Sequence, residues 1–251
     1  MCKVDVFGVG IDPLPLGETL GFILDAVASN RRALVTHAHI TRLNLAYEQA
    51  RLRAFYNHCD LVYCDGVGVV VGARWLGNRI PERYTLADWV WMLADRSAQQ
   101  RASLFLLGNS PGDAKRAAEN LYKRFCDLHI VGAQHGYFDK VPGCVEIELV
   151  IQRINTVQPN LLLVGMGMSV QERWLIENWP GLKANVAITC VALFEYLSGD
   201  LPCGPRWMTQ NYLGWLARLM ISPRRYAWRY FRDLPFFTNR IAKQKHVVNR
   251  L

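Results

Sequence analysis

Several features are missing from this 251-residue sequence, and each absence excludes a class of protein. There is no run of 18 apolar residues, so no segment is expected to cross a bilayer. The first ten residues lack the basic head and long apolar stretch of a secretory signal, which predicts a cytosolic protein. The seven cysteines form no C-x-x-C pair, and their odd number argues against a disulfide framework. We expect reduced thiols, most of them buried.

Acidic residues are almost absent from the last 46 positions, which hold ten Lys or Arg and one acid. The other 205 residues carry 19 basic and 20 acidic side chains, so the net charge of the chain lies at one end. Nine aromatic residues lie between the basic residues of this tail. A near-neutral body with a cationic, aromatic tail indicates an anionic partner, which could be a membrane surface, a phosphorylated ligand or a nucleic acid.

Short apolar runs alternate with amphipathic stretches, which predicts a mostly parallel sheet covered by helices on both faces. The predicted strands are Val4–Val9, Ala33–His37, Leu61–Cys64, Leu104–Leu107, His129–Val131, Leu161–Gly165 and Asn185–Cys190. The predicted helices are Leu16–Ala28, Ile40–His58, Leu86–Gln99, Asp113–Phe125, Val145–Thr156 and Val170–Trp179. We expect an α/β core over residues 1–200 and a basic helical appendage over 201–251, with two amphipathic segments near 206–221 and 224–232.

In an open parallel sheet, ligands bind at the carboxyl ends of the strands. Asp65 follows a predicted strand, where its carboxylate can act as a general base or contact a sugar hydroxyl. It can equally cap the helix that begins at Val67. Thr36 ends the preceding strand, either as a hydroxyl contact or as an ordinary β-branched strand residue. His37 and His39, two positions apart, would supply half of a metal site, but the spacing offers no third ligand.

Three further segments carry polar groups that could meet a ligand. The loop from Gly108 to Gly112 links a strand to a helix, and its amides could cradle phosphate, although many such loops bind nothing. Gln171 and Glu172 begin a helix, where they could reach the sheet edge or simply favour the helix dipole. The tail arginines could clamp a diphosphate or form a solvated face. No D-x-D pair is present to hold a divalent metal on a diphosphate.

Taken in order, these pieces resemble the WecG/TagA/CpsF glycosyltransferase family from about Val35 to Asp233. They include Thr36 before a helix, Cys59-Asp60-Leu-Val leading to Asp65-Gly-Val-Gly68, and Glu82-Arg83 followed by Asp88. Next come Phe105-Leu-Leu-Gly108 with Pro111-Gly112, Gly136-Tyr-Phe138, and Val164-Gly-Met-Gly167 with Gln171-Glu172. Pro205-Arg-Trp-Met208, Trp215-Leu-Ala-Arg218, Pro223-Arg-Arg225 and Arg229-Tyr230 complete the set.

The resemblance implies a Rossmann-like core and an inverting, metal-independent transferase without a cofactor. Such an enzyme moves a sugar from a UDP-sugar to a glycan on a polyprenyl diphosphate, at the inner face of the bacterial cytoplasmic membrane. It implies that Asp65 is the catalytic base, that Thr36 lines the site, and that the tail docks on the membrane in a homo-oligomer with no nucleic-acid partner. The substrate-binding residues it implies are Asp88, Gly108, Gly136, Gly167, Gln171, Glu172, Arg218, Arg224, Arg225 and Arg229.

The sequence also departs from the family pattern, and several departures fall at positions that line the donor pocket. The departures are Ala38, Leu86, Ser169-Val170, Thr189 to Ala192, Glu195, Cys203 and Gly214. We therefore expect an active enzyme whose donor sugar, of the N-acetylmannosamine, hexose or uronic acid type, differs from that of other members. The alternative is an inactive paralogue or a scaffold docked on a polysaccharide assembly.

Overall fold

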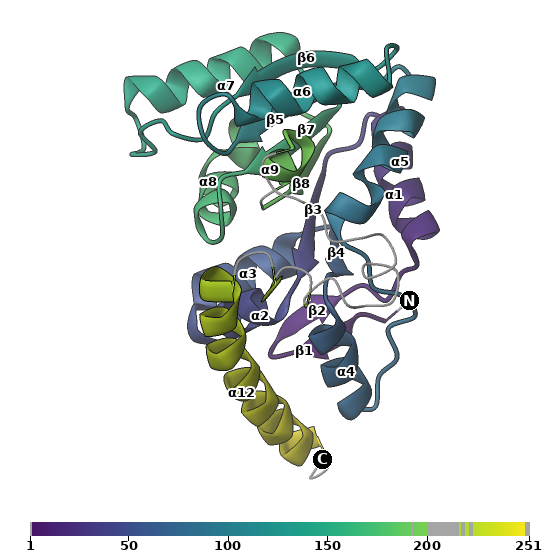
Figure 1. The fold of residues 1–251 in the computed structure, drawn as a ribbon, viewed down its shortest axis with the longest axis vertical. Coiled ribbons are helices and arrows are strands. Elements are labelled where there is room, and N and C mark those ends of the chain that lie inside the picture. The colour runs from purple at the N-terminus through teal and green to yellow at the C-terminus, as the bar shows by residue number, and fades with distance from the viewer. Residues whose placement is uncertain (1, 192, 200–215, 217–218, 221–222, 249–251) are drawn as a thin grey trace.

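A computed structural model describes residues 2–191, 193–199, 216, 219–220 and 223–248, with the backbone alone for 223–230 and 248. Its main sheet has six strands in the order β4-β3-β8-β7-β5-β6 (Figure 1). All five strand pairs are parallel, which confirms the predicted α/β class. The strands are β3 (Ala33–Ala38), β4 (Leu61–Cys64), β5 (Ser103–Gly108), β6 (His129–Gln134), β7 (Leu161–Gly165) and β8 (Val186–Thr189).

Helices cover both faces of this sheet, as the alternating pattern predicts. One face packs against α1 (Leu16–Ala28), α5 (Leu86–Gln99), α6 (Asp113–Arg124) and α9 (Leu193–Leu197). The other packs against α2 (Ile40–Glu48), α3 (Ala50–His58), α7 (Val145–Val157) and α8 (Val170–Asn178), which the 3-10 turn Trp179–Gly181 extends. Every residue of β3, β4, β5, β7 and β8 is buried, because a parallel sheet between two helical layers has no solvent face.

The N-terminal apolar run does not form the single strand expected over Val4–Val9. It folds back on itself as an antiparallel hairpin of β1 (Val4–Val6) and β2 (Val9–Ile11), separate from the main sheet. The chain reverses at Phe7 and Gly8, whose φ angles of 60° and 77° are those of a tight turn. Val6 and Val9 therefore pair across the hairpin instead of continuing one strand.

The predicted helix over Ile40–His58 is two helices. Gln49 separates α2 from α3 because its φ and ψ of −113° and 101° are extended. Its amide still bonds to Leu45 O, and its carbonyl accepts from Arg53 N. The break lets α2 and α3 follow different directions around the same core, which the hydrophobic periodicity of the segment did not reveal.

The basic tail contains a 26-residue helix, α12 (Pro223–Val248), which includes the predicted segment 224–232 and continues well past it. The predicted segment 206–221 lies almost wholly outside the described residues. α12 runs along α2 and beside α4 (Val67–Trp75) and the β1-β2 hairpin (Figure 1). Phe237 and Ile241 are buried there, and the ring of Phe237 lies against Gly72 of α4. No helix in the described part of the chain is long and apolar enough to cross a membrane.

Candidate active site

Three polar residues that lie far apart in the sequence are found in the last part of β3, in the last part of β8 and just after β4. The hydroxyl oxygens of Thr36 and Thr189 lie 2.8 Å apart, since β3 and β8 are neighbours in the sheet. Asp65 follows β4, and its amide donates to Ala38 O at the end of β3. Asp65 therefore lies just past the carboxyl end of β4, whereas Thr36, two residues before the end of β3, and Thr189 are both fully buried.

Asp65 does not cap the helix that follows it, so that interpretation of the sequence is wrong. The residue at the N-cap of α4 is Gly66, which has no side chain to cap the helix. Gly66 has a φ of 114°, a conformation that favours glycine, and a Cβ at this position would lie 3.1 Å from the His39 ring. The Asp65 side chain keeps 18% of its surface exposed, which leaves it within reach of a solute.

The two histidines of β3 and its end have separate surroundings. His39 caps α2, where its Nδ1 accepts from Thr41 N. His37 is buried, and its Nε2 lies 3.8 Å from Asp65 Oδ2. Burial, together with the charges of Arg42 and His39, lowers the pKa of His37 well below 6.5, whereas the backbone of Thr189 raises it. Within the described residues, no group of three or more His, Cys, Asp or Glu side chains is placed to hold a metal ion.

A buried ionic network lies behind these strand ends. Arg42 Nη1 of α2 lies 2.5 Å from Glu172 Oε1 of α8 and 3.3 Å from the Tyr56 hydroxyl. Burial raises the pKa of Tyr56 to about 12, so it remains a neutral phenol. Tyr56 and Glu172 outweigh the effect of burial and hold the pKa of Arg42 above its ordinary value. Sequence reasoning missed Arg42, because nothing in the spacing of α2 distinguishes a buried arginine from an exposed one.

Gln171 and Glu172, expected to meet a ligand, are both fully buried. Gln171 Nε2 donates to Glu172 Oε1 over 3.2 Å, so the two side chains form part of the network around Arg42. Gln171 Oε1 is buried without a hydrogen-bond partner in the described part of the chain. Glu172 Oε2 is likewise buried without a hydrogen-bond partner there, while Glu172 Oε1 holds the ion pair with Arg42.

Asp88 and the glycine loops show structural functions beside their predicted binding roles. Asp88 accepts from Thr85 N and forms a capping box that starts α5. Gly108 has a φ of 143°, and a Cβ there would lie 2.2 Å from Gly165 O, so the close approach of two strand ends requires glycine. In the same loop the amides of Asn109 and Ser110 already donate to Gly165 O and Asp113 Oδ2.

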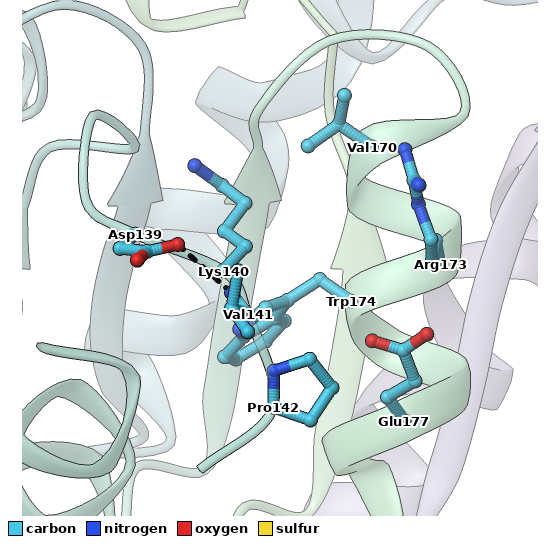
Figure 2. A pocket seen from close by; sticks show the side chains of 8 residues that line it. All are labelled: Asp139, Lys140, Val141, Pro142, Val170, Arg173, Trp174 and Glu177. Carbon is cyan, nitrogen blue, oxygen red and sulfur yellow. Dashed lines mark hydrogen bonds between the residues drawn. The ribbon is translucent and has the colours of Figure 1, made fainter. Parts of the chain in front are cut away.

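A cavity of about 350 Å³ lies between α8 and the loop that precedes α7 (Figure 2). Lys140, on the loop side, donates from Nζ to the carbonyls of Gly136 and Phe138 over 2.5 and 3.0 Å. Arg173 and Glu177 project from α8 on the other side (Figure 2). Lys140 thereby fixes the loop that begins at Gly136. Gly167, another predicted binding residue, has a φ of 90°, and a Cβ added there would meet no atom within 4 Å.

The tail arginines cannot be placed against this edge. Arg218 lies outside the described residues. Arg224, Arg225 and Arg229 lie on the first turns of α12, where only the backbone is described. Their binding roles, like those of the other predicted site residues, therefore remain predictions.

The fold is that of an α/β protein with an open parallel sheet, a class in which ligands bind at the carboxyl edge where Asp65 lies. A family model described as "Glycosyl transferase WecG/TagA/CpsF family" matches residues 4–250. The chain belongs to this family and is a glycosyltransferase.

Curated relatives match the chain over nearly its full length. One, from Staphylococcus aureus (strain MRSA252), is 26% identical over 256 residues, which cover 99% of this chain and 95% of the relative. Another, from Bacillus spizizenii (strain ATCC 23059 / NRRL B-14472 / W23), is 23% identical over 238 residues, which cover 88% and 90%. Both are named N-acetylglucosaminyldiphosphoundecaprenol N-acetyl-beta-D-mannosaminyltransferase.

Proposed function

We propose that the protein transfers a sugar, N-acetylmannosamine or a related hexose or uronic acid, from a UDP-sugar to a glycan on a polyprenyl diphosphate in the synthesis of a bacterial surface polysaccharide. The observation that carries this proposal is the match of nearly the whole chain to relatives whose names specify an N-acetylglucosaminyl-diphosphate lipid as acceptor. The range of donors reflects the departures from the family pattern, of which Ala38 and Thr189 are the last residues of β3 and β8.

The proposed reaction is a single displacement with inversion at the anomeric carbon. Asp65 accepts the proton of the acceptor hydroxyl while that oxygen forms a bond to the anomeric carbon and the bond to UDP breaks. The partial exposure of the Asp65 carboxylate supports this role, because a base must touch its substrate. Thr36, predicted to line the site, and Thr189 are fully buried and hydrogen-bond to each other, so their proposed part is to hold together the strands that carry the site.

UDP leaves with additional negative charge on its diphosphate, and the proposed mechanism neutralises this charge without a metal. The tail supplies the cations, with Arg218, Arg224, Arg225 and Arg229 as the residues proposed to bind the UDP or lipid diphosphate. The absence of a D-x-D pair from the sequence fits the same mechanism. Gln171 Oε1 is the buried acceptor proposed to orient the substrate.

The protein is further proposed to lie on the cytoplasmic surface of the membrane as a homo-oligomer. Besides the buried Phe237 and Ile241, α12 carries exposed apolar side chains, with Phe231 79%, Leu234 49% and Phe236 55% exposed. Arg232 is half-exposed beside them. Aromatic and basic side chains on one helix favour the interface of an anionic membrane, where the lipid-linked acceptor resides.

The experiment that tests this function measures UDP release with purified protein, chelator, and vesicles that carry a polyprenyl-diphosphate N-acetylglucosamine. The donors are UDP-hexoses, UDP-N-acetylhexosamines and UDP-uronic acids, one at a time. Release with one donor that persists in chelator and requires the acceptor supports the proposal. If no donor gives UDP release while the protein still binds the vesicles, the result would favour a scaffold or an inactive paralogue instead.

A further inference from the structure

The position of His37 suggests a role that the proposed chemistry does not yet include. Its imidazole is packed against the Tyr63 ring, with the ring centroids 5.6 Å apart, so its orientation is fixed by the core. Nε2 faces the Asp65 carboxylate at 3.8 Å, while Nδ1 is buried without a hydrogen-bond partner in the described part of the chain. One edge of the ring therefore faces the proposed base, and the other is enclosed by protein.

The two members of this pair differ in access to solvent, and the difference assigns their roles. The side chain of His37 is 9% exposed and that of Asp65 is 18% exposed. Asp65 is the member that a substrate hydroxyl reaches, and His37 lies behind it. An imidazole in this position cannot take the substrate proton itself, but it can hold the group that does.

The charges around His37 favour the neutral ring. Arg42 acts on it from α2, His39 from the position before α2, and the backbone of Thr189 from β8. Tyr63 packs on it from β4, and Asp65 lies at the sheet edge. A neutral imidazole has one N–H. If that hydrogen were on Nδ1, the lone pair of Nε2 would point at the Asp65 carboxylate, an arrangement that costs free energy.

We infer that His37 is a positioning residue for the proposed base, and this inference rests on the proposed function. In its Nε2–H tautomer it donates to one oxygen of Asp65 and directs the other oxygen at the acceptor hydroxyl. The separation of 3.8 Å is longer than a hydrogen bond and closes when the acceptor is bound, as catalytic contacts commonly do. The substrate proton goes to Asp65 and not to His37, so the imidazole is unchanged by the reaction.

Two substitutions separate this role from packing. His37→Leu keeps an apolar side chain of moderate size but removes the donor, whereas in His37→Gln an amide N–H reaches the position of Nε2. We expect His37→Leu to lower kcat by about tenfold or more with KM little changed. The acid limb of its pH–rate profile should move to higher pH, because the carboxylate loses a donor that favours its charged form. His37→Gln should restore both.

Tyr63→Phe is the matched control, since it keeps the ring that packs on His37 and should leave the acid limb in place. Equal impairment of the Leu and Gln variants, or an unmoved acid limb in His37→Leu, would overturn the inference. A wild-type enzyme without turnover would count against the proposed function instead.

The tautomer provides a test that needs no turnover. In protein labelled with ¹⁵N-histidine, the His37 ring can be assigned from the signal missing in His37→Gln, and we expect the proton on Nε2 at pH 7.5. A proton on Nδ1 would overturn the inference whatever the activity assays show.

Discussion

Single residues at the site divide into those that a solute can reach and those that only hold the site together. Asp65 belongs to the first set, whereas Arg42, Glu172 and His37 are buried. A buried charge is tolerated when its partner is present and becomes costly when the partner is removed. The support of this active site can therefore be measured through stability, separately from catalysis.

Glu172→Gln should destabilise the protein strongly, because it leaves the buried guanidinium of Arg42 without its carboxylate. We expect the free energy of unfolding to fall by about 3–5 kcal/mol in urea denaturation. Glu177→Gln on the same helix is the matched control, since Glu177 pairs with Arg51 at the surface and should cost about 1 kcal/mol or less. Similar losses in both variants would show that the Arg42 pair contributes no more than a surface pair.

The buried His37 should make stability depend on pH. Its folded pKa lies below 6.5, so between that folded pKa and 6.5 the unfolded chain binds a proton that the folded chain does not. The contribution of His37 to stability is therefore complete above pH 6.5 and is lost as the pH falls, by up to about 1.4 kcal/mol per pH unit. His37→Gln should lose less stability than wild type between pH 7.5 and 5. If wild type and His37→Gln lose the same stability over this pH range, His37 is protonated equally in the folded and unfolded states.

Asp65→Asn should abolish sugar transfer and leave the fold intact, because an amide cannot accept the proton of the acceptor hydroxyl. We expect kcat to fall by about 100-fold or more, measured as UDP release with the active donor. Asp127→Asn, a change of an exposed acid far along the chain, should transfer sugar at the wild-type rate. Unimpaired turnover by Asp65→Asn would end the assignment of the base.

At this scale, the sequence predicts residues that follow a strand and misses residues that meet across the fold. Asp65 directly follows β4, so the rule for parallel sheets locates it, whereas Thr36 lies two residues inside β3. The contact of Thr36 with Thr189 depends on β3 and β8 being neighbours, and the pair of Arg42 with Glu172 depends on how α2 packs near α8. Neither depends on spacing along the chain.

Among the elements, α12 is attached to the core by a few close contacts. Asp233, the single acid of the tail, is buried, and it accepts from Thr41 over 2.6 Å while its carbonyl accepts from Asn44. Arg240 donates to Asn44 O and Glu48 on α2. The one acidic residue of the tail thus stabilises its docking, which the count of charges alone did not indicate.

Gly72→Ala tests how closely α12 packs on α4. An alanine in a helix is ordinarily worth about 1 kcal/mol over glycine, yet here its Cβ would lie 2.8 Å from the Phe237 ring. We expect a lower unfolding temperature for Gly72→Ala. Gly21→Ala in α1 is the control, because its Cβ would meet nothing within 4 Å and the variant should be stabilised. An equal rise in the unfolding temperature of both variants would show that α12 does not pack closely against Gly72.

The outward face of α12 should bind anionic lipid. Replacing Phe231 and Leu234 by Ser should weaken binding to phosphatidylglycerol vesicles about tenfold or more, since each buried side chain contributes 1.5–3 kcal/mol or so. Val145→Ser removes an exposed apolar residue from α7 and should leave binding unchanged in a sedimentation assay. Equal binding by the double variant would exclude this face as the membrane contact.

Across the whole molecule, the alternation of strands and helices predicts the class of the fold but not its strand order. Seven strands were expected, and the first proved to be a hairpin outside the sheet, because its four apolar positions can be buried by a tight turn as well as by an extended strand. The division into a core and an appendage remains a prediction. What the structure adds is that α12 packs on elements from the start of the chain.

That packing has a consequence for biosynthesis. Phe7 contacts the Phe237 ring at 5.3 Å between centroids, and Gln244 bonds to Asp5 and to the amide of Phe7. A nascent chain leaves the ribosome with its N-terminal residues first, so the hairpin and the side of α2 that α12 covers stay uncovered until α12 emerges. A chain stalled before residue 223 would therefore present this apolar surface to chaperones.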